Sequence, residues 1–411
     1  MKRIFLVFGA VAFSSFFGFS QNSAIGYRKK KIVKEDIQFI YSHYFQNGNH
    51  SAVTGGIGTE KLQVFGPEFI LKRNLDSLKS YTIDLGVDVI SSASTDKIDY
   101  VMSSASRVDQ HVYLGVGHER PLTRHKNIVL NAGVSSAIES DYLSFGGTLG
   151  IRVSSKDQSR EFSAELESYF DDLRWGRLGG ERPLQLVYPA ELRYKQWFTQ
   201  YRRRTTNLNL TFQQTINTRN LLSFFPGITY QSGLLSTPFQ RVYFTNNEVR
   251  VENLPNHRLE IPLGLQLNTF LGDKYVLRNY YRFYWDDFGI VAHTYNVELA
   301  MLISSKFTLT PMVRLYTQKG SSYFKPYKKH DIQQEFYTSD YDLSSFQSIE
   351  PGLEGRFAIS TRQGDPRYLN LRYNFYRRSD GLQAHMLTLS ADLSVAHRTS
   401  MPRNNHRFLR Q

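Results

Sequence analysis

Long segments of strict apolar–polar alternation constrain the fold of this chain more than any other feature. Such segments run to about 10 to 14 residues, whereas strands of soluble sheets average about 5 to 6. A strand that crosses a membrane needs about 9 to 11 residues, apolar toward lipid and polar toward a lumen. The pattern therefore predicts an all-β, transmembrane, antiparallel up-and-down barrel, with a secreted sandwich or propeller as the alternative. The clearest examples are residues 207–213, 258–268, 369–376 and 387–395.

The composition excludes several other classes of protein. The chain has 411 residues, among them 29 Phe, 26 Tyr and no Cys. So many aromatic residues exclude a disordered chain, and the lack of a run of about 20 apolar residues beyond position 20 excludes a helical membrane protein. Without cysteine there is no disulfide framework, cysteine-ligated zinc or thiol catalysis.

The first twenty residues have the pattern of a secretory signal peptide. Lys2 and Arg3 precede an apolar stretch, and Gly18 and Ser20 are small residues suited to cleavage before Gln21. We therefore expect export to the outer membrane of a Gram-negative bacterium. The full chain has a formal net charge of +13. In an exported protein this excess favours anionic lipid or lipopolysaccharide as the complement, rather than nucleic acid.

Turn signals divide the rest of the chain into about sixteen strands, with fourteen or eighteen as alternatives. We predict a signal peptide at 1–20, an N-terminal periplasmic or plug segment at 21–58, the barrel at 59–397 and a basic periplasmic tail at 398–411. The expected strands lie near 60–72, 80–90, 107–117, 127–138, 142–154, 160–171, 184–199, 205–217, 221–231, 257–270, 274–285, 291–303, 307–319, 346–360, 367–378 and 382–396.

The lengths of the connections predict the sidedness of the barrel. In such barrels long loops lie outside the cell and short turns lie in the periplasm. The segments Gly320–Ser345 and Ser232–Asn256 are long, so we place them outside. This choice puts Ser304–Lys306, Thr361–Pro366 and the end of the last strand in the periplasm, as an even number of strands requires.

Several sequence blocks resemble a family of predicted outer-membrane barrels of unknown function. The most specific block is Tyr280–Thr294, which reads YRFYWDDFGIVAHT from Tyr281, and further matches are TGGIGTE from Thr54, DVISSAS from Asp88, DYLS from Asp141 and RLYTQ from Arg314. The resemblance implies the barrel fold and the outer-membrane location. It assigns no activity and no functional residue, although the gene neighbourhood of the family suggests a periplasmic or redox protein partner.

A register for the last third of the chain predicts a ladder of charges on the inward face. With a turn centred on Phe288, Arg278 faces Glu298 and Arg282 faces Thr294; with a turn centred on Ser305, Glu298 faces Met312 and lies diagonal to Arg314. We interpret the mixed signs as ion pairs that stiffen the wall of a narrow lumen. The ladder consists of Arg278, Arg282, Glu298, Arg314, Glu350, Glu354, Arg356, Arg372 and Asp392.

The block Asp286–Gly289 with His293 also suggests an enzyme alternative. An Asp pair, Asp286 and Asp287, near a histidine at a barrel rim resembles the site of some barrel proteases, and general base catalysis needs His293 within about 3 Å of its partner. The register instead places His293 on the lipid-facing row. We therefore interpret the block as a structural loop in which Gly289 supplies the positive φ.

Two further groups of residues are candidate binding sites. The repeated Ser-Ser-Ala-Ser at 91–94 and 103–106 offers oxygen ligands for Ca²⁺ together with Asp84, Asp88, Asp96, Asp99 and Asp109. The spacing fits no EF-hand, and solvated serine turns are the alternative. The glycine-rich segment 54–59 lacks the Lys-Ser/Thr of a phosphate loop, and no hydrolase or dinucleotide motif occurs in the chain.

From the sequence we predict a membrane barrel that binds no cofactor and acts on an unknown substrate. It would serve as a narrow or plugged channel, or as a scaffold for an envelope complex; the alternative is an outer-membrane protease or lipase with a rim site. The expected partners are outer-membrane lipid, lipopolysaccharide, the barrel assembly machinery and the periplasmic partner above.

Overall fold

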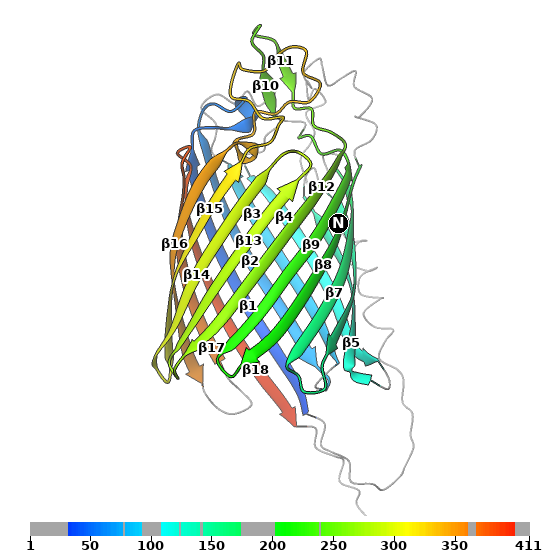
Figure 1. The fold of residues 1–411 in the computed structure, drawn as a ribbon, viewed down its shortest axis with the longest axis vertical. Coiled ribbons are helices and arrows are strands. Elements are labelled where there is room, and N and C mark those ends of the chain that lie inside the picture. Colours follow the sequence, from blue (N-terminus) through cyan, green and yellow to red (C-terminus); the bar gives the residue numbers. More distant parts are fainter. Residues whose placement is uncertain are drawn as a thin grey trace, which may run out of the picture. The chain divides into compact units, whose positions relative to one another are not determined.

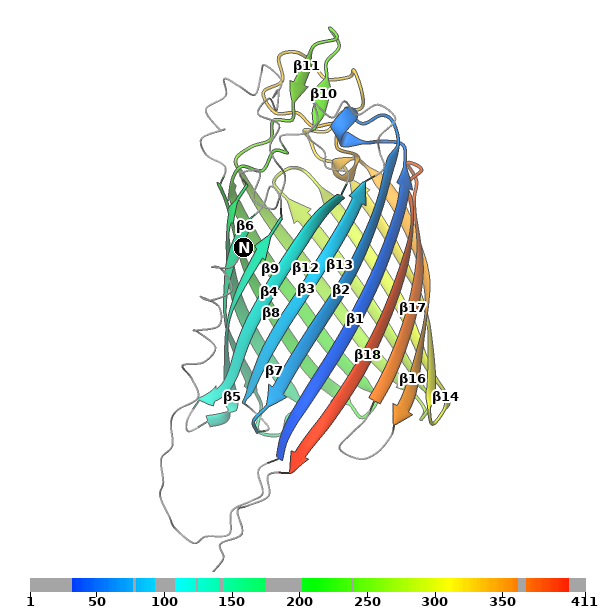
Figure 2. The same cartoon turned by 180° about the vertical axis from the view of Figure 1, so that it is seen from behind.

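Alternating apolar and polar residues build a closed antiparallel barrel, seen from two sides in Figures 1 and 2. This computed structural model describes residues 32–76, 79–92, 108–122, 125–139, 143–173, 202–237, 240–360 and 367–398, and within these ranges the barrel has sixteen strands. The predicted fold class and strand number are confirmed. No helix in these ranges is long and apolar enough to cross a membrane.

Each strand of the barrel pairs with its neighbour along the chain, β9 pairs with β12, and β1 closes the ring against β18. The strands are β1 (Ile32–Gly48), β2 (Glu60–Asn74), β3 (Ser80–Ser92), β4 (Val108–Leu122), β5 (His125–Ile138), β6 (Leu143–Ser154), β7 (Arg160–Asp172), β8 (Arg202–Asn217), β9 (Asn220–Gly233), β12 (His257–Leu271), β13 (Tyr275–Asp286), β14 (Val291–Ser304), β15 (Phe307–Lys319), β16 (Phe346–Ser360), β17 (Arg367–Arg378) and β18 (Gln383–Arg398).

The outer face of the barrel is apolar and exposed. Val134 is 66% exposed and Leu149 is 64% exposed, and they lie on neighbouring strands, β5 and β6. Large apolar side chains in water would be costly at about 25 cal/mol per Å², so this face fits lipid. The inward face carries the polar residues of each alternation. This division into two faces is the pattern of a membrane-spanning barrel.

The barrel begins earlier than the sequence predicted. Residues 32–48 form β1, which pairs with β2 from Lys34 opposite Asn74 to Gly48 opposite Glu60, so the prediction of a plug at 21–58 is wrong for this part. The alternation in β1 is blurred because aromatic residues stand on both faces: Phe39 and Phe45 point outward, and Tyr44 points inward. The other predicted segments, 1–20 and most of the tail, lie outside the described residues.

One predicted strand also falls outside the description. The segment 184–199 belongs to the part of the chain that the structure does not describe, while β7 pairs directly with β8 from Arg160 opposite Gln214 to Asp172 opposite Arg202. The ring of sixteen strands therefore takes β1 as its additional member and leaves no position for a strand between β7 and β8.

The two ends of the barrel differ in their connections. At one end, called here the turn end, strands are joined by short segments such as 218–219, 272–274 and 305–306. At the other, the loop end, lie the connections 49–59, 234–256, 287–290, 320–345 and 379–382. The long segments predicted to share one side therefore do so, and the segment 49–59 joins them there instead of lying with the turns.

Three connections of the loop end pack together into a cap, defined as the described residues 49–59, 234–237, 240–256 and 320–345 (Figure 1). It contains the short strands β10 (Arg241–Tyr243) and β11 (Val249–Val251) and the 3₁₀ turns η1 (Ala52–Thr54) and η3 (Tyr341–Leu343). Val242, Phe244 and Tyr337 form a buried apolar cluster inside it. The ring of His50 stacks on Tyr341 with 3.8 Å between centroids, so the cap is packed as a unit.

Candidate functional site

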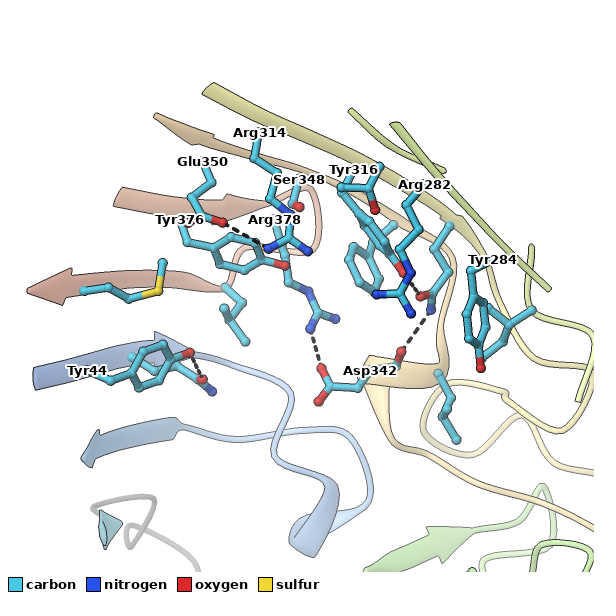
Figure 3. A pocket seen from close by; sticks show the side chains of 18 of the residues that line it. Tyr44, Arg282, Tyr284, Arg314, Tyr316, Asp342, Ser348, Glu350, Tyr376 and Arg378 are labelled. Atoms are coloured by element: carbon cyan, nitrogen blue, oxygen red, sulfur yellow. Dashed lines mark hydrogen bonds and ion pairs between the residues drawn. The ribbon is translucent and has the colours of Figure 1, made fainter. Parts of the chain in front are cut away.

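A cavity of about 700 Å³ lies inside the barrel at the loop end, directly beneath η3 of the cap (Figure 3). Its walls come from β1 and β2 on one side and from β12–β18 on the other. The charged residues and tyrosines that line it are Arg258, Arg282, Arg314, Arg378, Tyr44, Tyr284, Tyr316, Tyr376, Glu60, Asp342 and Glu350.

Arg258, the first of these arginines, is fixed by Asp286. Asp286 is completely buried, and its Oδ2 accepts hydrogen bonds from Arg258 Nη2 at 2.6 Å and from the Tyr284 hydroxyl at 3.0 Å. Its Oδ1 accepts the backbone N–H of Ile290 at 2.9 Å. Arg258 also stacks on the ring of Phe288. The pair between Arg258 and Asp286 therefore holds the turn between β13 and β14 in place.

The second fixed arginine, Arg378, holds the cap to the barrel wall. Only 4% of its side chain is exposed, and its guanidinium bonds Asp342 of η3, Asp380 at 2.5 Å and the carbonyl of Tyr341 at 2.8 Å. The guanidinium lies 3.9 Å from the ring centroid of Phe346. Because η3 is tied to β17 in this way, it forms the roof of the cavity.

Gln318 reinforces the same attachment from β15. Its side-chain amide donates to the carbonyls of Asp342 at 2.9 Å and Ser344 at 2.7 Å. The hydroxyl of Tyr316 donates in turn to the Gln318 carbonyl oxygen, at 2.5 Å. The roof therefore rests on hydrogen bonds from two strands.

Two other arginines of the cavity are held much more loosely. Within the described part of the chain, Arg282 of β13 makes no hydrogen bond or ion pair, and its side chain is exposed to the lumen. Arg314 of β15 has one ion pair, with Glu350 at 3.6 Å, and half of its side chain is exposed. Glu350 is itself held by the amide of Asn374 at 2.6 Å. Figure 3 shows Arg282 and Arg314 directed into the space beneath η3.

The opposite side of the cavity carries two carboxyl groups, Asp342 and Glu60, and the side chain of Glu60 is hydrogen-bonded by Gln46. The side chain of Asp342 is 72% exposed although one oxygen bonds Arg378. Glu60, at the start of β2, lines the side formed by β1 and β2. The cavity thus presents weakly bonded cationic groups on one wall and acidic groups on its roof and far wall.

The inside of the cap contains a buried carboxyl group, that of Glu252. Glu252 is fully buried; its Oε2 accepts the backbone N–H of Thr237 at 2.6 Å and its Oε1 accepts the Thr338 hydroxyl at 2.5 Å. Burial raises the pKa of Glu252 to about 8. Burial and the nearby Asp342 also raise the pKa of Asp340, whereas burial lowers the pKa of His330.

The residues of the predicted charge ladder lie on the inward face, in the predicted register. Arg278 is opposite Glu298 and Arg282 is opposite Thr294, as the turn centres required; Arg278 reaches Glu298 at 3.2 Å. Arg314 does not extend diagonally to Glu298 but pairs with Glu350, directly opposite on β16.

The remaining members of the ladder have other partners. Arg372 makes two hydrogen bonds to Glu354, and Arg356 stacks on the ring of Tyr368 at 4.0 Å. Asp392 accepts from Gln38 at 2.8 Å and from Asn370 at 2.9 Å. Of the ladder residues, only Arg282, Arg314 and Glu350 line the cavity. The ladder therefore extends along the barrel wall and does not form a single binding site.

Charged residues on the inward face are divided by sign between two opposite arcs of the ring. The predicted ladder covers only one of these arcs, so it did not predict the division. On β12–β17 they are predominantly arginine: Arg258, Arg278, Arg282, Arg314, Arg356, Arg372 and Arg378, beside Glu260, Asp286, Glu298, Glu350 and Glu354. On β2–β7 they are predominantly acidic: Glu60, Glu68, Asp84, Asp88, Glu119, Glu161, Glu165, Glu167 and Asp171, beside Lys72 and Arg152. Each arc spans six strands, and two strands separate the arcs on either side of the ring (β8 and β9, β18 and β1), so the arcs face each other.

The block that suggested an enzyme is a structural turn. His293 lies on the outer face, where its Nδ1 is 2.7 Å from the hydroxyl of Tyr281, and it contacts no carboxylate among the described residues. Gly289 has the expected positive φ, +91°, and an added Cβ would lie 2.5 Å from Ser322 Oγ of the cap. Asp286 pairs with Arg258 as described, and Asp287 N–H bonds the carbonyl of Leu259.

The serine and aspartate cluster is described only in part. Asp88 lies 3.3 Å from His111 Nδ1 on the inward face, and the second serine repeat lies outside the described residues. In the ranges that the structure covers, no group of three or more His, Asp or Glu side chains is arranged to hold a metal ion.

Comparison with known proteins identifies the family. The sequence profile described as "Protein of unknown function (DUF3570)" matches residues 108–394. The chain belongs to this family. No curated protein matches the sequence.

Several solved barrels are similar in structure. A bacterial polysaccharide outer membrane secretin has a TM-score of 0.46 at 11% identity, covering 90% of this chain and 100% of its own. OprD of Pseudomonas aeruginosa has 0.42 at 12%, covering 89% and 94%. OpdK of the same organism, with vanillate, has 0.40 at 8%, covering 89% and 99%. At these TM-scores the likeness adds nothing to what the strand pairing shows of the fold.

Sequence reasoning placed Arg282, Arg314 and Glu350 on the right face but missed the cavity. Arg258, Arg378 and Asp342, which build its roof and wall, were not singled out. The signal available for Arg378 was its inward position at the end of a strand, beside a loop rich in aspartate. Chemically, the cavity can bind a small polar solute through the guanidinium of Arg282, the half-exposed Arg314 and the tyrosine hydroxyls.

Proposed function

We propose that this protein is an outer-membrane channel of a Gram-negative bacterium, exported by its signal peptide and inserted by the barrel assembly machinery. Small polar solutes pass through a narrow lumen whose loop end, facing outside, is partly covered by the cap. The observation that carries this proposal is the charged, hydrogen-bonding lumen with a cavity at its capped end. A barrel of sixteen strands is wide enough for an aqueous channel, and lipid with lipopolysaccharide surrounds its apolar face.

The enzyme alternative is not retained. The residues that suggested it are divided between the two faces of the barrel: Asp286 is buried inside against Arg258, and His293 lies outside against Tyr281. A base and its partner must lie within about 3 Å of each other or of a shared water. This separation favours the channel.

Cysteine labelling tests the sidedness. The chain has no native cysteine, so Asn246→Cys in the exposed part of the cap should react with a membrane-impermeant maleimide on intact cells, whereas Ser305→Cys at the turn end should react only after lysis. Both positions are exposed in the structure, so a difference in labelling between them cannot result from burial of one of the thiols. Labelling of Ser305→Cys alone on intact cells would reverse the topology.

Planar-bilayer recordings test the channel. We expect the refolded protein to give small conductance steps, with cations preferred over anions because the acidic arc carries the larger excess charge. Replacing residues 321–343 by a short Gly-Ser linker removes η3, the roof of the cavity, and should raise the conductance severalfold. The barrel itself should stay closed, because Gln318 and Phe346 remain paired at the ends of β15 and β16.

Lys306→Gln, a charge change in a turn at the opposite end, provides the control and should leave the conductance unchanged. Absence of conductance steps from both the full protein and the linker variant would contradict the channel. Equal conductance with and without residues 321–343 would contradict the part of the proposal that assigns the narrowing to the cap.

A further inference from the structure

We propose that the cavity beneath η3 is a binding site for a small zwitterionic solute that carries one carboxylate and one amine. The inference rests on the proposed channel, for which it names the class of solute. It places the carboxylate at Arg282 and Arg314 and the ammonium at Glu60 and Asp342, which line the same cavity of about 700 Å³.

The carboxylate position follows from the different states of the four arginines. Arg258 is partly buried and Arg378 is buried, and both donate hydrogen bonds to carboxylates, Arg258 to Asp286 and Arg378 to Asp342 and Asp380. Arg282 uses none of its donors among the described residues, and Arg314 has only the 3.6 Å contact with Glu350. A guanidinium has five N–H donors in a planar fork that matches a carboxylate in two parallel hydrogen bonds. Free donors in a partly enclosed space are therefore suited to an anionic group.

The ammonium position follows from the opposite side of the cavity. Asp342 is fixed by Arg378, which holds one carboxylate oxygen, yet its side chain is 72% exposed into the cavity. Glu60 stands at the start of β2, across from Arg282 and Arg314, which lie on β13 and β15. A purely anionic solute would meet these carboxylates as like charges. A solute with an amine satisfies both sides, which is why we favour a zwitterion over a simple acid.

The division of charge continues below the cavity. Along the lumen the arginine-rich arc of β12–β17 faces the acidic arc of β2–β7, so a zwitterion keeps the same orientation as it moves through. The rings of Tyr44, Tyr316 and Tyr376 also line the cavity and offer apolar faces with hydroxyl ends. Pockets for small molecules typically enclose about 300 to 1,000 Å³, so the size suits an amino acid or a short peptide.

A matched series of three probes tests this assignment by calorimetry on the whole refolded protein. Phenylalanine carries both charges, 3-phenylpropionate carries only the carboxylate, and phenethylamine carries only the amine. We expect phenylalanine to bind at least tenfold more tightly than either single-charge probe. Arg282→Gln should weaken phenylalanine and 3-phenylpropionate about tenfold and leave phenethylamine unchanged, whereas Glu60→Gln should weaken phenylalanine and phenethylamine and spare 3-phenylpropionate.

Arg356→Gln is the matched control, because Arg356 lies on the same arc near the turn end, stacks on Tyr368 and does not line the cavity; all three affinities should stay as in the wild type. Equal binding of the three probes, or phenylalanine binding that Arg282→Gln leaves unchanged, overturns the site. Tighter binding of 3-phenylpropionate than of phenylalanine overturns the zwitterion.

Calorimetry separates this inference from the proposed function. It requires no pore, so the expected binding pattern in a protein without conductance would overturn the channel and leave the site standing. Conductance steps together with no binding of any probe would overturn the site and leave the channel standing.

Discussion

Replacing Asp286 by alanine is expected to destabilise the loop end of the barrel by about 3 to 5 kcal/mol, the cost of leaving one partner of a buried ion pair without the other. Asp286 is completely buried and accepts three kinds of donor: the guanidinium of Arg258, the hydroxyl of Tyr284 and the backbone N–H of Ile290. Alanine removes all three acceptors at once. Arg258 would keep its charge with only Glu260, 3.8 Å away, as a carboxylate contact.

Asp286→Asn is the graded comparison for this prediction. It keeps an oxygen for the Ile290 N–H but loses the charge opposite Arg258, so its effect should fall between the wild type and alanine. Urea unfolding of the refolded barrel in detergent, followed by the gel shift between folded and heat-unfolded protein, measures both. A midpoint for Asp286→Ala that matches the wild type would show that Arg258 finds another partner at no cost.

Register was predictable wherever alternation and short turns acted together. From β12 to β15 the turns 272–274, 287–290 and 305–306 leave little freedom, and a slip of one residue would move every apolar side chain into the lumen. The pairs Arg278 with Glu298 and Glu298 with Met312 were therefore predictable from the positions of the turn centres in the sequence. In β1 the same logic failed, because Phe39 and Tyr44 make both faces aromatic and hide the period of two.

The cavity could not be predicted because its parts are brought together by ring closure and by the cap. Tyr44 of β1 and Tyr376 of β17 line the same cavity only because β1 closes the ring against β18. Arg378 bonds Asp342, which lies in a loop of about 26 residues, and the conformation of so long a loop cannot be predicted from its sequence. Alternation assigns a residue to the inner or outer face of the barrel. It does not show which loop folds over that residue or which side chains it contacts. The division of the arginines into firmly bonded and weakly bonded ones could therefore not be predicted.

Raising the pH from 7 to 9 is expected to loosen the cap, and Glu252 is the group responsible. Its pKa is raised to about 8 by burial, from an ordinary value of 4.5, so the folded cap holds a proton that the unfolded cap has already released. Stability falls with rising pH wherever the folded state binds more protons. The stabilisation is complete below about pH 4.5, declines as the pH rises and is lost above about pH 8, a change of several kcal/mol in total.

The other titrating groups of the cap set the pH window for the test. Asp340, whose pKa is also raised, acts in the same direction as Glu252. His330 acts in the opposite direction, because its lowered pKa makes the folded cap gain stability as the pH rises toward the ordinary value of 6.5. Above pH 7 that contribution is exhausted, so the loss from Glu252 dominates.

Thiol labelling measures this loosening without interference from the pH dependence of the thiol itself. The labelling rate of Val242→Cys, at a completely buried position of β10, is divided by that of Asn246→Cys, at an exposed position of the same cap. We expect this ratio to rise by up to about tenfold between pH 7 and pH 8, the limit for release of one proton, and to level off above pH 8. In a Glu252→Gln background, where the amide can accept from the Thr237 N–H and donate to the Thr338 hydroxyl without titrating, the ratio should stay flat. The same rise in that background would assign the effect to Asp340 in place of Glu252, and a flat ratio in the wild type would mean that the proton on Glu252 does not stabilise the cap.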